Sequence, residues 1–332
     1  MKKIYLHVGF GKTGSSALQS YLSLNMLPIN SMRESLVYCS VTNDGELIYG
    51  EALAQAANNN PLKYEASNPE INKLINIEKV CEGLNRLFAD GKTPILSQED
   101  WGRRGNEFIK SGLLEKIGCK AHVVAYVRPQ VEWLNSAWWQ WYAWDSNFKS
   151  PEDVIDAWGC RFMCWAEQLR NWEKNINVCG LSVNPQPKDI VADFLKRLGI
   201  KETAVDHPYA RNNTSLSLPL ILAIKNIPIE RKPHDANVDA ILSGALNLPG
   251  KSPWIIKNRL IESVIDGCFK DNIDLVNMMT AESALVMLND SRWWKSEYYT
   301  DRLVISDEDL RLSSEEALQL AAMVVEGLLK KC

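Results

Sequence analysis

The stretch from Lys3 to Ser16, with the sequence KIYLHVGFGKTGSS, constrains this chain more than any other part of it. A short apolar run leads into a turn with three glycines, one lysine and three hydroxyl side chains, and an amphipathic segment follows. This order predicts a β-strand, a loop and the start of a helix. Backbone N–H groups, the positive end of the helix dipole and an ammonium group would then face one place. The stretch therefore predicts a binding site for a phosphate or a sulfate.

The first alternative is that this stretch is the P-loop of a protein that binds a nucleoside triphosphate. That motif reads G-x-x-x-x-G-K-[ST], so Gly11, Lys12 and Thr13 would require a glycine at position 6, where this chain has Leu6. The sequence also has no clear apolar strand that ends in a magnesium-binding aspartate. A P-loop phosphotransferase or kinase is kept as an alternative, as is an ordinary strand-to-helix turn with an incidental lysine.

A second strand carries a second candidate phosphate site. Residues 121–127, AHVVAYV, are apolar and rich in β-branched residues, which predicts a buried strand ending at Arg128. Pro129 then opens a helix, and Ser136 lies about two turns into it. A guanidinium and a hydroxyl converging there would suit a phosphate. The alternative is an arginine paired with a surface carboxylate beside a neutral serine.

With these motifs in order, the chain resembles the sulfotransferases that use 3′-phosphoadenosine-5′-phosphosulfate (PAPS). In that family a K-T-G-[ST]-[ST] loop after the first strand holds the 5′-phosphosulfate, and an arginine with a serine eight residues on holds the 3′-phosphate. Weaker similarities to bacterial members lie at Leu96–Glu99, Asp193–Ile200 and Arg211–Leu216, so the resemblance covers roughly residues 1–230. The R-K-G and G-D-W-K segment of animal cytosolic enzymes is not visible here.

The resemblance implies a P-loop-NTPase-like sulfotransferase fold and PAPS as co-substrate, without a metal. It implies that PAPS is held by residues of the loop, the second strand and the 211–216 segment: Gly11, Lys12, Thr13, Gly14, Ser15, Ser16, Arg128, Ser136 and Arg211. The expected acceptor is a carbohydrate or natural-product hydroxyl, or another small molecule. A catalytically silent nucleotide-binding protein of the same fold is a further alternative.

Sulfuryl transfer depends mainly on positioning and electrostatics, by analogy with phosphoryl transfer. Lys12 is expected to neutralise charge that grows on the bridging oxygen. Glu99 is the first candidate for the general base because it follows the strand at 94–98, and His7 is the second. The alternatives are that Glu99 pairs with Arg103, Arg104 or Lys12, and that His7 is a core residue.

Aromatic residues gather after Arg128. Six of them fall within twelve positions, too many to face one core from one helix: Trp133, Trp138, Trp139, Trp141, Tyr142 and Trp144. Some are therefore expected to line a cleft, where aromatic faces suit sugar rings or aromatic acceptors. A two-sided core is the alternative.

Composition excludes several classes of protein. The net charge of −4 argues against a general nucleic-acid binder, and no apolar run approaches the ~18 residues of a membrane helix. Eight scattered cysteines fit reduced thiols, and Cys160 and Cys164 lack further ligands at zinc spacing. We expect a cytoplasmic protein without a metal site.

The order of expected elements predicts an α/β fold with a three-layer parallel sheet and helices on both faces. Further expected elements are a strand at 94–97 and helices at 77–89, 107–117, 130–144, 161–174, 187–198 and 216–226, with a loop at 201–215. Ser150–Asp153 and Ser313–Glu316 have the pattern of helix starts. We expect the α/β domain over residues 1–230, with a mainly helical extension or cap over 231–332.

Overall fold

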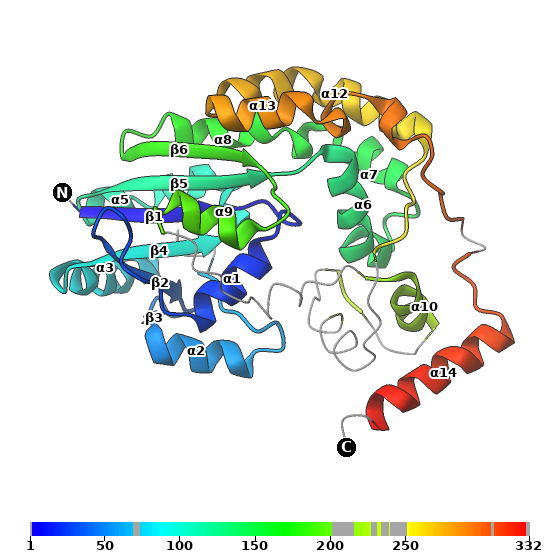
Figure 1. Ribbon diagram of the computed structural model, residues 1–332, viewed down its shortest axis with the longest axis horizontal. Helices are drawn as coiled ribbons and strands as arrows, with labels where there is room; N and C mark the ends of the chain where they lie inside the picture. The colour runs from blue at the N-terminus through cyan, green and yellow to red at the C-terminus, as the bar shows by residue number, and fades with distance from the viewer. Residues whose placement is uncertain are drawn as a thin grey trace. The chain divides into compact units, whose positions relative to one another are not determined.

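The described residues contain one six-stranded sheet in the order β3-β2-β4-β1-β5-β6, seen in a computed structural model of the chain (Figure 1). All neighbouring strands are parallel except β2 and β3, which are antiparallel. This confirms the expected α/β class with a mostly parallel sheet. The strands are β1 (Lys2–Val8), β2 (Ser35–Val41), β3 (Leu47–Tyr49), β4 (Lys92–Gln98), β5 (Cys119–Val127) and β6 (Val178–Pro185).

The structure describes residues 2–68, 74–200, 216–226, 231–233, 239, 251–306 and 309–329. The expected loop at 201–215, and Arg211 with it, lies outside them. The helices are α1 (Ser15–Leu24), α2 (Gly50–Asn59), α3 (Leu74–Ala89), α4 (Gly105–Lys110), α5 (Leu113–Lys116), α6 (Gln130–Gln140), α7 (Pro151–Trp158), α8 (Trp165–Glu173), α9 (Ile190–Arg197), α10 (Leu218–Asn226), α12 (Asn258–Asn277), α13 (Ala281–Asn289) and α14 (Ser314–Leu329). Short 3₁₀ segments are η2 (Glu99–Trp101), η3 (Tyr142–Trp144), η4 (Arg161–Met163), η6 (Ser291–Trp293) and η7 (Ser296–Tyr299).

The central strand β1 is buried on both faces because helices cover the sheet on each side. Leu6 pairs with Leu96 of β4 on one side and with Val123 of β5 on the other. One face forms a core against α1 and α9, in which Tyr5 and Tyr126 meet Leu18 and Phe194. On the sheet, α3 contacts β4, α5 contacts β5 and α8 contacts β6.

The order in which strands are added to the sheet switches sides at β1. From β1 the chain adds β2, β3 and β4 on one side, and it then crosses to add β5 and β6 on the other. Ligands of open parallel sheets bind outside the carboxyl ends of the strands at such a switch point. A ligand site is therefore expected at the loops that follow β1 and β5.

Several expected helices are shorter or divided. The helix expected at 107–117 is two helices, α4 and α5, separated at Gly112, whose φ of 68° is left-handed. The helix expected at 130–144 ends at Gln140 and continues as η3, and the one at 161–174 begins with η4 before α8. The helix expected from Pro187 starts at Ile190, because the Asp189 side chain accepts a hydrogen bond from the Ala192 N–H and caps it.

Two expected helix starts have reciprocal caps. Ser150 and Asp153 bond each other's backbone N–H groups before α7, and Ser313 and Glu316 do so before α14. Each pair satisfies two N–H groups that a helix leaves without intrahelical partners. Local sequence therefore sets both boundaries.

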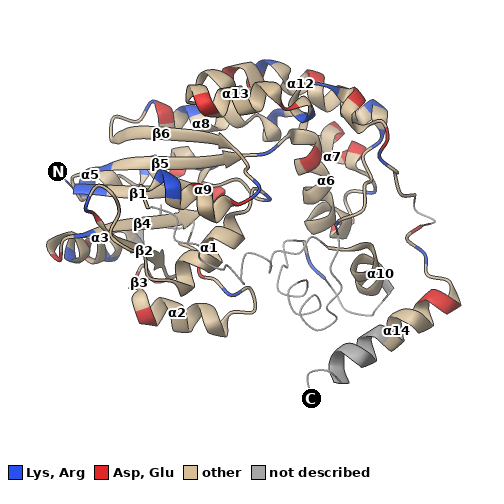
Figure 2. Cartoon of the chain, viewed as in Figure 1, with Lys and Arg blue, Asp and Glu red and all other residues tan. Residues whose placement is uncertain are grey.

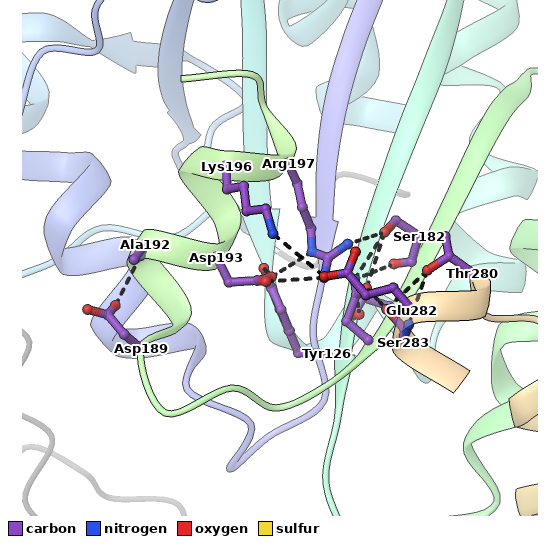
Figure 3. Close-up of polar contacts among 12 residues, drawn as sticks. Tyr126, Ser182, Asp189, Ala192, Asp193, Lys196, Arg197, Thr280, Glu282 and Ser283 are labelled. Atoms are coloured by element: carbon purple, nitrogen blue, oxygen red, sulfur yellow. Dashed lines mark hydrogen bonds and ion pairs between the residues drawn. The ribbon is translucent and has the colours of Figure 1, made fainter. Parts of the chain in front are cut away.

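Helix α9 is anchored to the sheet by a polar network (Figure 3). Asp193 accepts a hydrogen bond from the Tyr126 hydroxyl at 2.7 Å and a two-pronged ion pair from Arg197, with Nε–Oδ2 at 2.6 Å and Nη2–Oδ1 at 3.1 Å. Arg197 also donates to the Ser182 hydroxyl of β6 at 3.3 Å. These contacts join α9 to β5 and β6.

By its contacts the chain groups into two compact units. The first unit comprises Met1–Arg128, Cys164–Asn213 and Lys270–Asn289, and the second comprises Pro129–Met163, Thr214–Phe269 and Asp290–Cys332. Charged residues of both signs are interspersed along α12, whereas α13 carries a single charged residue, Glu282 (Figure 2). Among the described residues, no helix combines the length and apolarity that crossing a bilayer would need.

Candidate functional site

The loop from Gly9 to Gly14 joins β1 to α1 beside the point where the order of strand addition switches sides. Two of its residues have left-handed backbone angles, with φ of 66° at Lys12 and 96° at Gly14. Thr13 stabilises the turn between them, because its hydroxyl donates to the Phe10 carbonyl at 2.6 Å and its N–H donates to the same oxygen at 3.3 Å. Turns that alternate in this way direct successive backbone N–H groups toward one anion.

The start of α1 carries an uncapped positive end. Gly14 is the N-cap residue and has no side chain to accept from the first N–H groups, while its carbonyl accepts from the N–H groups of Ala17 and Leu18. The Ser15 hydroxyl is buried and has no hydrogen-bond partner within the described part of the chain. A buried hydroxyl without a partner costs about 1–3 kcal/mol. A ligand oxygen at this place would recover that cost.

Gly9 brings three candidate residues together. A Cβ at position 9 would lie 2.4 Å from the Ser15 Oγ, 3.2 Å from the His7 ring and 3.4 Å from the Glu99 Cα. Only a glycine fits there without displacing one of them. The structure therefore places His7, Ser15 and Glu99 around the start of the loop.

Gly102, in the turn after β4, packs directly against Gly9. The Gly102 N–H donates to the Gly9 carbonyl at 3.1 Å, and a Cβ at position 102 would lie 2.4 Å from that oxygen. The turn after β4, which contains Glu99, is thereby held against the loop after β1. Glu99 lies at the carboxyl edge of the sheet, where the sequence predicted it.

Arg128 joins the end of β5 to the loop. Its Nη1 donates to the Lys12 carbonyl at 3.3 Å, and its own carbonyl accepts from the Trp165 indole N–H at 2.9 Å. The guanidinium therefore lies beside the loop. Ser136 lies half-buried on α6, in the second unit.

The electrostatics of Glu99 suit a group that accepts a proton. Burial is the main cause that raises the pKa of its carboxyl above the ordinary value, and repulsion from Asp100 adds to it. The ammonium of Lys12 and the guanidinium of Arg103 act in the opposite direction without cancelling the rise. Lys12 is thus close enough to Glu99 to act on its charge.

Tyr64 is a residue of this site that the sequence did not indicate. Its pKa is raised to about 12, first by burial and then by the charge of Glu99, while a hydrogen bond with Ser16 acts against the rise. Tyr64 lies between α2 and α3, far from both partners in the sequence. No local pattern marks it, because only the fold brings that segment to Ser16 and Glu99.

His7 is held as a neutral, fully buried imidazole. Its Nδ1 lies 2.7 Å from the Ser97 Oγ, and Gln19 donates to the same hydroxyl at 3.1 Å. Burial lowers the pKa of His7 to about 3. Its Nε2 is buried with no hydrogen-bond partner in the described residues. Between the two candidate bases, the geometry and charge favour Glu99.

No protein-family profile matches this chain, and a search of curated protein sequences returns no match. Within the described residues, no group of three or more His, Cys, Asp or Glu side chains is arranged to hold a metal ion.

Proposed function

We propose that this protein is a PAPS-dependent sulfotransferase that moves a sulfuryl group to a hydroxyl of a carbohydrate or natural product. The observation that carries the proposal is the loop Gly9–Gly14, with its two left-handed residues and an uncapped α1 behind it. An anion is the ligand for which such a loop is built. The K-T-G-S-S sequence of the loop, together with Arg128 at the end of β5, resembles the donor site of PAPS-dependent sulfotransferases and supports a phosphosulfate nucleotide as the anion.

The protein groups then have distinct roles. Backbone N–H groups of the loop and the Ser15 hydroxyl would bind the 5′-phosphate oxygens, and Arg128 would bind the 3′-phosphate. The ammonium of Lys12 would offset negative charge on the oxygen that bridges phosphorus and sulfur as its bond to sulfur breaks. Glu99 would accept the proton of the acceptor hydroxyl as the new oxygen–sulfur bond forms, because its raised pKa favours proton uptake.

A cluster of aromatic rings in the second unit supports a carbohydrate as the acceptor. Six aromatic rings between α6 and η4 form a closed circuit of contacts, with neighbouring centroids 5.3–6.1 Å apart: Trp133, Trp141, Tyr142, Phe148, Trp158 and Phe162. Trp158 is 49% exposed, and Phe148 and Phe162 are half-buried. Rings held rigidly by their neighbours and still open to solvent suit the apolar faces of sugars.

Calorimetry with the donor product tests the activity. We expect 3′-phosphoadenosine-5′-phosphate to bind without magnesium, and we expect Arg128→Ala to weaken that binding far more than binding of the 3′-dephospho nucleotide. Magnesium-dependent binding of ATP in its place would identify a phosphotransferase and overturn the proposal. Nucleotide binding with no sulfuryl transfer to any member of a broad acceptor panel would identify a catalytically silent protein.

The acceptor class has its own test. Trp158→Ala should raise the acceptor KM of a carbohydrate substrate and leave affinity for the donor product unchanged. Trp158→Phe, which keeps an aromatic face, should recover most of the affinity for the acceptor. An unchanged KM in Trp158→Ala would remove the aromatic circuit from acceptor binding.

A further inference from the structure

Cys160 and α12 lie in close contact within the second unit. Cys160 follows α7 directly after Gly159, the C-cap residue, whose left-handed φ of 66° turns the chain away from the helix axis. The Cys160 thiol donates to the Ser263 carbonyl of α12 at 3.8 Å. The sulfur therefore rests on one face of α12.

Gly267, one turn beyond Ser263, explains how the sulfur reaches the helix. A Cβ at position 267 would lie 2.7 Å from the Cys160 Sγ and 3.1 Å from its Cβ. A glycine in the middle of a helix lowers the stability of that helix relative to alanine. Here the missing side chain leaves the space that the cysteine occupies.

Cys268 is the next residue along α12 and completes a pair of thiols. Its side chain is fully buried, whereas Cys160 is half-buried and reachable from solvent. A hydrogen bond from Cys268 lowers the pKa of the Cys160 thiol, although burial acts against this effect. Cys160 thus has the partly exposed position and the thiolate stabilisation that make a cysteine nucleophilic.

We propose that Cys160 and Cys268 form a redox-active dithiol, in which Cys160 attacks low-molecular-weight disulfides and Cys268 resolves the product into an intramolecular disulfide. In the first step the Cys160 thiolate attacks a disulfide RSSR, a sulfur–sulfur bond forms to one RS group, and the other leaves as RS⁻. In the second step the Cys268 sulfur attacks Cys160 Sγ, loses its proton and releases the second RS⁻. The protein gives up two electrons and the small disulfide is reduced to two thiols.

The other cysteines differ in ways that make them controls. Cys39 and Cys119 are buried, and burial raises the pKa of each thiol, to about 12 for Cys119. Cys179 is exposed. Cys39 and Cys119 should therefore resist oxidation. Cys179 should form a mixed disulfide with the small thiol and should not go on to an intramolecular disulfide.

The test is to incubate the reduced full-length protein with oxidised glutathione, alkylate the remaining thiols and map the peptides by mass spectrometry. We expect a Cys160–Cys268 cross-linked peptide in the wild type and in Cys179→Ser. Cys268→Ser should lose the cross-link completely and accumulate glutathione on Cys160. Cys160→Ser should leave Cys268 reduced.

Gly267→Ala provides a variant that keeps both thiols. The added methyl group should displace the Cys160 sulfur and strongly reduce the cross-linked fraction, while circular dichroism shows the helix content retained. Three outcomes in the wild type would overturn the proposal: glutathione on Cys160 with Cys268 still reduced, a cross-link from Cys160 to Cys164, or no modification of Cys160. A Gly267→Ala variant that cross-links as fast as the wild type would also count against it.

Discussion

At the scale of single residues, Lys12 is the exception in the loop. Its φ of 66° lies in the region where residues with a Cβ are uncommon, and glycine would occupy it at lower cost. Strain of this kind persists where the surrounding structure holds it and often marks a functional position. Under the proposed function, this position supplies an ammonium group as well as the turn.

Replacing Lys12 with methionine tests this role. We expect Lys12→Met to lower kcat on the order of 10²–10³-fold, because the charge on the bridging oxygen would develop without a cation. Affinity for the donor product should fall much less, since the ammonium acts mainly in the transition state. Lys12→Arg keeps the charge and should retain more activity than Lys12→Met. Equal losses in kcat and in product affinity would contradict this role.

Glu99 gives a prediction in which stability and activity move in opposite directions. Because its pKa is raised in the folded protein, the ionised carboxylate lowers the free energy of unfolding as pH rises above its ordinary value of 4.5. Glu99→Gln cannot ionise, so near neutrality it should unfold at higher urea concentration than the wild type. If Glu99 is the base, kcat should fall on the order of 10²–10⁴-fold in the same variant.

Comparing pH values gives the control for Glu99. Well below pH 4.5 the wild-type carboxyl is protonated, and the difference in free energy of unfolding between wild type and Glu99→Gln should disappear. Glu107→Gln changes an exposed carboxylate on α4 and should have little effect at either pH. A Glu99→Gln protein less stable than the wild type near neutrality would show that the carboxylate is instead a structural partner.

Which site residues the sequence revealed depends on how far apart they lie along the chain. Gly9–Ser16 form one continuous run whose turn chemistry is local, so their place at the end of β1 was predictable. Tyr64 and Gly102 were not, because each meets the loop only through strand pairing and helix packing. Glu99 was found through the strand before it, since the carboxyl ends of parallel strands share one edge.

At the scale of elements, α9 depends on its first turn. The Asp189 carboxylate accepts from the Ala192 N–H at 3.0 Å, and Ile190 lies against Gly14, with its Cδ1 3.1 Å from where a Cβ would stand. The cap thus supports both the helix and one wall of the loop. Asp189→Ala should lower the free energy of unfolding by about 1 kcal/mol.

Asp189→Asn is the matched control, because asparagine caps helices about as well as aspartate. We expect it to unfold in urea at nearly the wild-type midpoint. If Asp189→Asn loses as much stability as Asp189→Ala, the stabilisation comes from the charge at the helix terminus and not from the hydrogen bond.

Of the six strands in the described residues, the sequence predicted β1, β4 and β5, and it did not predict β2, β3 or β6. β1, β4 and β5 lie at the centre of the sheet, and their continuous apolar runs predicted them. β6 was missed because it is an edge strand that carries Gly180 and Asn184 and is largely half-exposed. Gly180 is required there, since a Cβ would lie 2.8 Å from the His122 ring on β5. Such a requirement depends on a neighbouring strand and leaves no local pattern.

At the scale of the whole molecule, the first unit includes a helix, α13, that comes late in the chain. α13 packs on β6, where the Ser283 hydroxyl donates to the Asn184 Oδ1 at 2.9 Å and both residues are buried. Ser283→Ala should lower the free energy of unfolding on the order of 1–3 kcal/mol, because the buried amide oxygen loses its shortest partner. Urea denaturation of the full-length protein measures the change.

Leu285→Ala is the control from the same helix. Leu285 is 60% exposed, so its truncation should have little effect on the unfolding midpoint. If both variants lower the midpoint equally, the effect reflects the helix itself rather than its contact with β6.

The placement of α13 has a consequence for synthesis on the ribosome. Chains grow from the N-terminus at roughly 5–20 residues per second, and domains generally fold as units when their sequence is complete. The first unit draws on Lys270–Asn289, so β6 emerges long before the helix that covers it. During that interval the nascent chain would expose the edge of a nearly finished sheet, and chaperones that bind exposed strands would have their main opportunity there.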